Sequence, residues 1–255
     1  VVLAFIDLWG LGRVAPLTYR ADAPALVIEG VLVIAVLALT IMGHHLPAGM
    51  LYLRVTPVVL LILLAWMAGL YVIGHARKSQ SNDSKPVAKQ PARKTSISPT
   101  LWVFGAGALA TLAAGVALEI SGEAIAKSIG MTGAVFAATV LAAATSLPEL
   151  ATGLQSVRDG HYRLAVSDIF GGNAFLPVLF LMATLLSGKA VLPDAQPTDV
   201  YLTGLGILLT TVYLAGLVLR SKRQWWRMGI DSWLVLALYA LGVIGLLFIG
   251  SPAAT

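Results

Sequence analysis

Apolar residues fill the chain in long runs that are separated by shorter polar stretches. Roughly 17 to 25 apolar residues carry a helix across about 30 Å of hydrocarbon, and all the runs but the first reach that length. The first run, "VVLAFIDLWG", reads as an incomplete segment whose helix would begin before Val1. The predicted segments are 1–11, 25–43, 55–75, 101–120, 132–157, 163–186, 199–219 and 231–250. They predict an all-α, polytopic membrane helix bundle.

Composition supports a membrane protein. The chain is 58% hydrophobic and 11% charged, with a mean hydropathy of +0.87, which is far more apolar than a soluble domain. It has no cysteine, which excludes disulfides, thiolate metal sites and cysteine nucleophiles. No Ser–His pair or paired histidines lie within a span, so neither a membrane protease nor another enzyme is expected, and no cofactor is expected.

A basic, polar stretch at 76–100 predicts a flexible linker between two halves. Lys and Arg translocate poorly, so they mark the cytoplasmic side of a membrane protein. If the linker is cytoplasmic, all Lys and Arg except Arg54, Lys127 and Lys189 fall on that side. The net charge of +5 is then explained by topology in the lipid bilayer, and no nucleic-acid partner is expected.

The two halves repeat weakly. Residues 2–74 align without gaps with residues 178–250, and the alignment matches several glycines. The loop assignment puts Arg13 and its counterpart Lys189 on opposite sides, which predicts an inverted-topology repeat. We therefore expect residues 1–75 to be the carboxy-terminal part of a first repeat and residues 101–250 to be a complete second repeat.

The stretch "LAAATSLPELATGL" places polar chemistry in the middle of a span. A mid-membrane Glu149 is costly unless it faces protein or an ion. Pro148 has no N–H, so the carbonyl of Ala144 loses its usual partner. Thr145 and Ser146 add two hydroxyl oxygens. This group of hard oxygens suits Na⁺ or Ca²⁺; the alternative is a proline kink whose glutamate reaches the interface.

The next segment, "LAVSDIFGGNAFLPVLFL", repeats this pattern. Asp168 and Gly172 lie four residues apart and so share a helix face, with Asn173 beside them. Pro177 releases the carbonyl of Asn173. Gly171 and Gly172 also fit a simple packing role. The two interrupted helices, each with one buried carboxylate, are predicted to form two walls of one cation site.

The run "ATSLPELATGLQSVRDGHYRLAVSDIFGGNAFLPVLF" resembles the second alpha-repeat of the sodium/calcium exchanger family, in the cation/calcium antiporter superfamily. The alpha-repeat motif covers 132–186. The resemblance implies ten helices in two inverted halves of five, of which about eight segments are present here. It also implies that Glu149 is shared by Ca²⁺ and Na⁺, that Thr145 and Ser146 contribute oxygens to Na⁺, and that Asn173 lies at the site.

Several positions depart from the family pattern. Ala144 replaces a glycine, Gly172 replaces a serine, and Leu176 stands where Asn or Asp is usual. Ser167 and Asp168 replace a Gly-Asn pair, so a carboxylate has moved along the same helix face. These changes leave the choice of ion open.

The resulting hypothesis is a secondary-active antiporter of a bacterial inner membrane that exchanges Ca²⁺ for Na⁺, H⁺ or K⁺ at Glu149. The first alpha-repeat would precede Val1. The expected site is therefore completed by amino-terminal helices, by a separate chain or by a second copy. Two alternatives are a non-transporting membrane component and a channel, although breaks paired in inverted halves favour a carrier.

Overall fold

The computed structural model describes residues 1–11, 15–21, 24–47, 49–52, 54–82 and 97–250. Most of this part is helical, and six helices are long and apolar enough to cross a membrane. A seventh span exists if the bent pair Gly133–Thr145 and Leu147–Arg158 is counted as one. The predicted all-α membrane bundle is confirmed.

The elements follow the predicted order of spans closely. In chain order they are α1 (Val2–Gly10), α2 (Leu17–Arg20), α3 (Pro24–His44), α4 (Pro57–Asn82), α5 (Ile97–Ser128), α6 (Gly133–Phe136), a π-helical turn (Ala137–Leu141), α7 (Ala142–Thr145), α8 (Leu147–Arg158), α9 (Tyr162–Phe175), a 3₁₀ turn (Leu176–Val178), α10 (Leu179–Ser187), a second 3₁₀ turn (Leu192–Asp194), α11 (Pro197–Leu219), β1 (Gln224–Trp225), β2 (Met228–Gly229) and α12 (Ile230–Gly250). Helices α4 and α5 extend into both ends of the predicted linker 76–100, and its middle, 83–96, lies outside the described residues.

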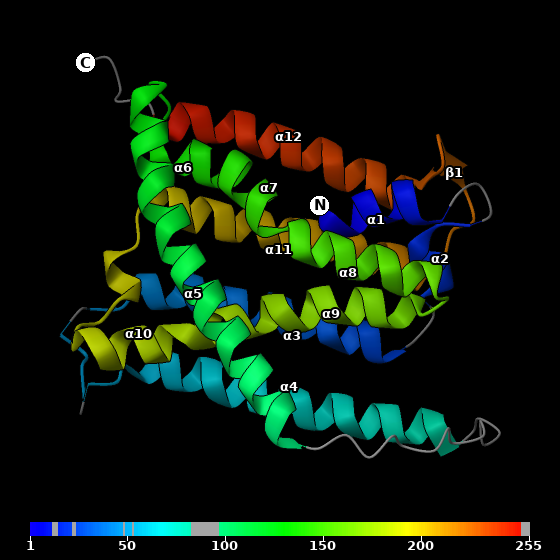
Figure 1. Cartoon of the computed structure of the whole chain (residues 1–255), viewed down its shortest axis with the longest axis horizontal. Coiled ribbons are helices and arrows are strands. Elements are labelled where there is room, and N and C mark those ends of the chain that lie inside the picture. The colour runs from blue at the N-terminus through cyan, green and yellow to red at the C-terminus, as the bar shows by residue number, and fades with distance from the viewer. Residues whose placement is uncertain (12–14, 22–23, 48, 53, 83–96, 251–255) are drawn as a thin grey trace.

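Helices that the repeat alignment pairs run in opposite directions across the bundle. In Figure 1, α3 runs from the right-hand end to the left, and its counterpart α11 runs from left to right. Helix α4 runs from left to right, and its counterpart α12 runs back. This is the arrangement that an inverted repeat requires.

Basic loops gather at one end of this bundle. Figure 1 shows α2, the turn between α8 and α9, β1 and the last residues of α4 at the right-hand end. These segments carry or adjoin Arg20, Arg158, Arg163 and Arg223. Arg13, the counterpart of Lys189 in the repeat alignment, lies outside the described residues. The side of the membrane that this end faces stays a prediction.

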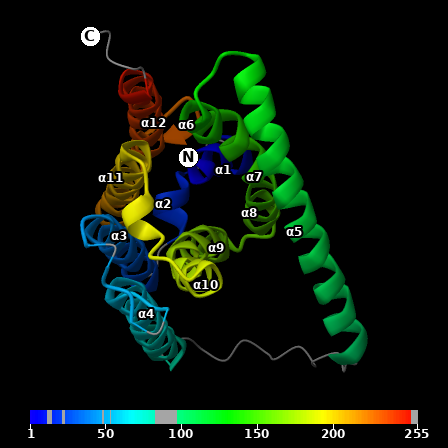
Figure 2. The same ribbon diagram turned by 90° about the vertical axis from the view of Figure 1, so that its left-hand side faces the viewer.

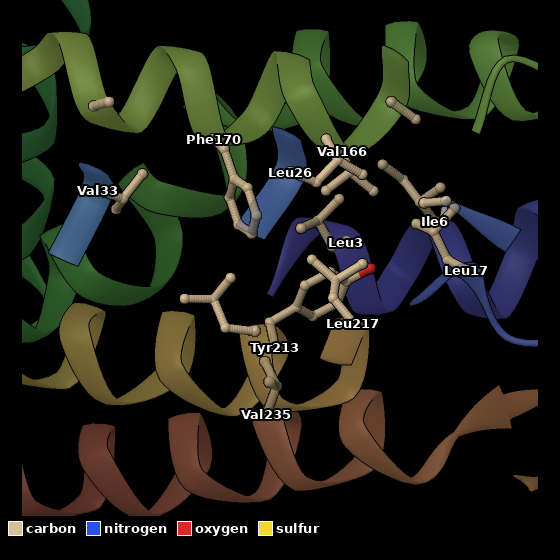
Figure 3. Close-up of a cluster of buried hydrophobic side chains, with 14 of the residues drawn as sticks. Leu3, Ile6, Leu17, Leu26, Val33, Val166, Phe170, Tyr213, Leu217 and Val235 are labelled. Atoms are coloured by element: carbon tan, nitrogen blue, oxygen red, sulfur yellow. The ribbon is translucent and has the colours of Figure 1, made fainter. Parts of the chain in front are cut away.

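The core is built where α1, α3, α9, α11 and α12 meet. Leu3 and Ile6 of α1 pack with Val166 and Phe170 of α9 in one buried cluster, which Figure 3 shows between the helices. A glycine allows one close approach: a Cβ on Gly30 would lie 2.5 Å from Leu214 Cδ2. Small residues at such contacts let helix backbones come close in a membrane.

Helix α5 lies apart from this core. Figure 2 shows it along one side of the bundle, next to α6 and α7, and none of its residues from 101 to 121 is buried. Its exposed face is apolar along most of its length, with Trp102, Phe104 and Leu109 among the exposed side chains. A helix of this composition suits contact with lipid.

Candidate cation site

The span that carries the predicted site is broken where the sequence places a proline. The first half of the span, Gly133–Thr145, meets α8 at an angle of 44°, and Pro148 lies in the first turn of α8. Proline has no N–H, so it cannot donate to the Ala144 carbonyl as a residue four places on would. Ordinary bonding resumes at Leu150, whose N–H donates to the Ser146 carbonyl at 2.9 Å.

A π-helical turn, Ala137–Leu141, precedes this break and was not predicted. Such turns hold one residue more than an α-helical turn and leave backbone carbonyls displaced from their regular partners. The Tyr239 hydroxyl of α12 donates to the Ala138 carbonyl inside this turn. Thr139 adds a hydroxyl bond to the Val135 carbonyl at 2.7 Å. Tyr239 therefore links α12 directly to the irregular backbone that leads into the break.

The neighbouring span is interrupted as well. Helix α9 ends at Phe175, and Pro177 lies in the 3₁₀ turn that connects α9 to α10. Asp168, Gly172 and Asn173 precede this interruption on α9, and all of them are exposed. The Asn173 side-chain amide donates to the Ile169 carbonyl at 2.7 Å. Asn173 also borders a cavity of about 170 Å³ that lies against α3, α11 and α12.

A side-chain contact joins the two interrupted helices. The Thr152 hydroxyl of α8 lies 3.3 Å from Asp168 Oδ2 of α9 and 3.2 Å from the Glu149 carbonyl. Thr152 follows Glu149 by three residues, so the two lie on the same side of α8. The structure therefore brings the Glu149 helix and the Asp168 side chain to one shared face. Thr152 was missed from the sequence, where it looked like an ordinary helix residue.

Burial at this face differs from the prediction. Glu149 and Asp168 were expected to be buried carboxylates, but both side chains are exposed in the structure. The reason is that no described helix covers this side of α8 and α9. Thr145 is also exposed, whereas Ala144 and Ser146 are half-buried. The Thr145 hydroxyl donates to the Leu141 carbonyl at 2.9 Å, which fixes it against the end of the π-helical turn.

The oxygens at this face form an open, partial set of ligands. Within the described residues, no three His, Cys, Asp or Glu side chains come together in a way that could hold a metal ion. What the face offers is two carboxylates from adjacent helices, three hydroxyls and the ends of two half-helices. Hard oxygens of this kind favour Na⁺ or Ca²⁺ over transition metals.

An ion pair between the half-exposed Arg77 and the buried Glu29 lies against α9, and it was also missed from the sequence. Arg77 Nη2 of α4 lies 2.5 Å from Glu29 Oε1 of α3 and 2.6 Å from the Ser167 hydroxyl. The Glu29 side chain is 5% exposed, and Ser167 directly precedes Asp168. Glu29 was visible as a carboxylate within an apolar span, by the same rule that identified Glu149.

Comparison with known proteins agrees with these features. The family profile described as "Sodium/calcium exchanger protein" matches residues 99–248. A human protein, "Sodium/potassium/calcium exchanger 1", is 33% identical over 95 residues, which is 35% of this chain and 8% of that relative. The match thus covers only a small part of the relative's length, and no solved structure matches significantly. Because the family profile matches more than half of this chain, the chain belongs to the sodium/calcium exchanger protein family.

Proposed function

We propose that this chain is part of a secondary-active antiporter that exchanges Ca²⁺ for Na⁺, H⁺ or K⁺. The observation that carries the proposal is the joining of two interrupted membrane helices by the contact of Thr152 with Asp168, in a chain of the sodium/calcium exchanger family. Glu149 lies on the same side of α8 as Thr152. The human relative's name refers to sodium, potassium and calcium, and we extend these ions to this chain as candidates.

The chemistry of the face supports a site for hard cations. Glu149 and Asp168 supply two carboxylates, and Thr145, Ser146 and Asn173 supply neutral oxygens. The carbonyl of Ala144 and the backbone beside Gly172 lie at the two helix interruptions. Ca²⁺ takes six to eight oxygens, so we infer that water or further protein segments provide the rest. Those segments belong to the same polypeptide, to another chain or to a second copy.

Competition for Glu149 would couple the two ion fluxes. One Ca²⁺ is neutralised by two carboxylates, whereas each Na⁺ needs one, so the same oxygens can hold either ion but not both. Opposed half-helices at the break direct backbone dipoles toward the bound charge. Relative movement of the repeats would then expose this site to one side of the membrane at a time.

The same exposure favours a second candidate function. Since Glu149 and Asp168 are open to the surrounding solvent or lipid, the chain also fits a binding component that transports only after another polypeptide covers this face. Reconstitution distinguishes the two candidates. Transport by the purified chain alone supports the complete carrier, and transport that requires an added partner supports the component.

We also propose that the membrane is a bacterial inner membrane, with the basic end of the bundle and the linker 76–100 in the cytoplasm.

Because the chain has no cysteine, one introduced thiol reports its own side of the membrane. Ser221→Cys, after α11 at the basic end, should react with an impermeant maleimide only from the cytoplasmic side. Ser187→Cys, at the end of α10, should react only from the opposite side. Both positions are exposed, and labelling of both from one side would contradict the topology.

The proposed cation site predicts the effect of neutralising its acids. In vesicles that contain the complete site, in which further segments cover the face, the bound ion and Glu149 would form a desolvated charge pair. Losing one partner of such a pair costs about 2–5 kcal/mol, so Na⁺-gradient-driven ⁴⁵Ca²⁺ uptake should fall at least about 30-fold with Glu149→Gln. Asp168→Asn should also lower uptake, and the two effects should not add, because both carboxylates serve one ion. Glu123→Gln is the matched control, because Glu123 is an exposed acid on α5 that pairs with Lys127 at 2.7 Å. Normal uptake by Glu149→Gln would refute the assigned role.

Tyr239 should act as a positioning residue for this site. An α-helix turns by about 100° per residue. If the π-helical turn reverted to a regular α-helical turn, α7 would therefore rotate relative to α6. One hydrogen bond contributes about 0.5–1.5 kcal/mol, so Tyr239→Phe should raise the apparent KM for Ca²⁺ about two- to tenfold and leave the maximal rate nearly unchanged. Tyr201→Phe is the control, because Tyr201 makes a similar bond to the Gly242 carbonyl at 3.0 Å, away from the site. Equal effects of the two substitutions would contradict a special role for Tyr239.

A further inference from the structure

The connection between α11 and α12 is a tight β-hairpin. Its strands β1 and β2 pair Gln224 with Gly229 and Trp225 with Met228, and residues 222–229 are called the hairpin segment. Both flanking helices are long and apolar enough to span a membrane, so the hairpin segment lies where they leave the hydrocarbon, at the level of the lipid headgroups. Figure 1 shows β1 at the basic end of the bundle, near α2.

The base of the hairpin is fixed to the protein core. Met228 is 1% exposed, and the Gly229 N–H donates to Asp7 Oδ2 of α1 at 2.7 Å. The same oxygen accepts from the Ser232 hydroxyl of α12 at 2.8 Å, and Asp7 Oδ1 accepts from the Leu17 N–H of α2 at 2.7 Å. Asp7 is fully buried. It therefore fastens the hairpin to α1, α2 and the first turn of α12.

A tryptophan of α12 supports the outer strand of the hairpin. Trp233 Nε1 donates to the Trp225 carbonyl at 2.8 Å, and the two rings lie 5.1 Å apart between their centres. Trp225 is nevertheless 62% exposed. Indole rings favour the membrane interface, because their apolar body and their polar N–H suit the boundary between hydrocarbon and headgroups. The pair gives the hairpin a rigid aromatic side at this boundary.

The tip of the hairpin has an unusual backbone for its residues. Trp226 and Arg227 form the two-residue turn, and their φ angles are 49° and 71°. Turns with positive φ at both central residues normally contain Asn or Gly, and bulky residues rarely adopt this conformation. Both side chains are exposed. Strained residues of this kind are concentrated at sites that bind ligands, so the anchored base holds an aromatic ring and a guanidinium outward at a cost.

The charged groups of the hairpin segment are all basic. Lys222, Arg223 and Arg227 are exposed. In the part of the chain that the structure describes, Arg223 and Arg227 form no ion pair with an acid. The carboxylates next to the hairpin are directed inward, since Asp7 is buried and Asp231 lies against the backbone of β2. Arginine presents a planar set of N–H donors that matches the oxygens of a phosphate.

We propose that the hairpin segment is a binding site for the phosphate headgroups of anionic phospholipids. Arg223 and Arg227 bond to the phosphate, and Trp225 and Trp226 lie among the neighbouring headgroups. An anionic lipid fits better than a zwitterionic one, because the cationic group of the latter would face the same arginines. The exposed indole rings beside two membrane spans favour a lipid over a soluble acidic partner. The site is separate from the Glu149 face and does not depend on ion transport.

Native mass spectrometry of the whole protein in neutral detergent tests this directly, by titration with phosphatidylglycerol or with phosphatidylcholine of the same acyl chains. We expect the native protein to bind phosphatidylglycerol more tightly. Replacing both arginines, Arg223→Gln with Arg227→Gln, should weaken phosphatidylglycerol binding roughly 30-fold, the equivalent of about 1 kcal/mol for each arginine. The matched control is Arg158→Gln with Arg163→Gln, which removes the same charge from exposed positions beside the turn between α8 and α9. It should leave the affinity nearly unchanged.

Two further measurements keep the test decisive if the arginine variant does not fold. Glycine adopts positive φ without strain, and Trp226 is exposed, so Trp226→Gly should be at least as thermally stable as the native protein while its affinity for phosphatidylglycerol falls. A photoactivatable phosphatidylglycerol should cross-link to the hairpin segment of the native protein. Equal affinity for the two lipids, equal losses in the two double variants, unchanged binding by Trp226→Gly, or cross-links confined to other segments would each overturn the proposal.

Discussion

In a membrane interior, a backbone or side-chain polar group has no water to bond with, so each one must find a partner inside the protein or hold an ion. Pro148 sets this constraint at one point: it removes an amide from the middle of a span, and the chain bends by 44° there. The adjoining residues, Thr145, Ser146 and Glu149, are those that we propose bind the cation. The π-helical turn before the break and the bond from Tyr239 adapt the rest of the span to the same irregularity.

The second interrupted helix, α9, is contacted by polar side chains from two neighbouring helices. Thr152 reaches Asp168 from α8, while Arg77, paired with Glu29, reaches Ser167 from α4. Ser167 and Asp168 are neighbours in sequence, so movement of α9 must disturb both contacts together. The proposed cation face and the Arg77–Glu29 pair thus contact adjacent residues of one helix, about 100° apart around its axis, and a movement of α9 would alter both contacts.

Much of the fold was predictable because a helix that spans a lipid bilayer must be long and apolar. Runs of apolar residues predicted most spans within a few residues, but α4 (Pro57–Asn82) and α5 (Ile97–Ser128) run well past their predicted ends at 75 and 120. Pro148 and Pro177 correctly marked the two interruptions. The π-helical turn was not predictable, since "AATVL" differs in no local way from an α-helical stretch, and the Tyr239 hydroxyl that bonds to it lies about a hundred residues away in the chain. The role of Asp7 was likewise hidden, because its partners Leu17, Gly229 and Ser232 come from separate parts of the chain. The exposure of Glu149 could not be foreseen, because burial depends on which segments cover a face and not on the face itself.

The central claim is that Glu149 binds the transported cation directly. The most direct measurement is to locate Ca²⁺ in an experimental structure of the protein in lipid, by anomalous scattering or by comparing maps with and without the ion. The account predicts Ca²⁺ between α8 and α9, with a Glu149 carboxylate oxygen at about 2.3–2.6 Å. An ordered Ca²⁺ within the membrane region that makes no contact with Glu149 would contradict it.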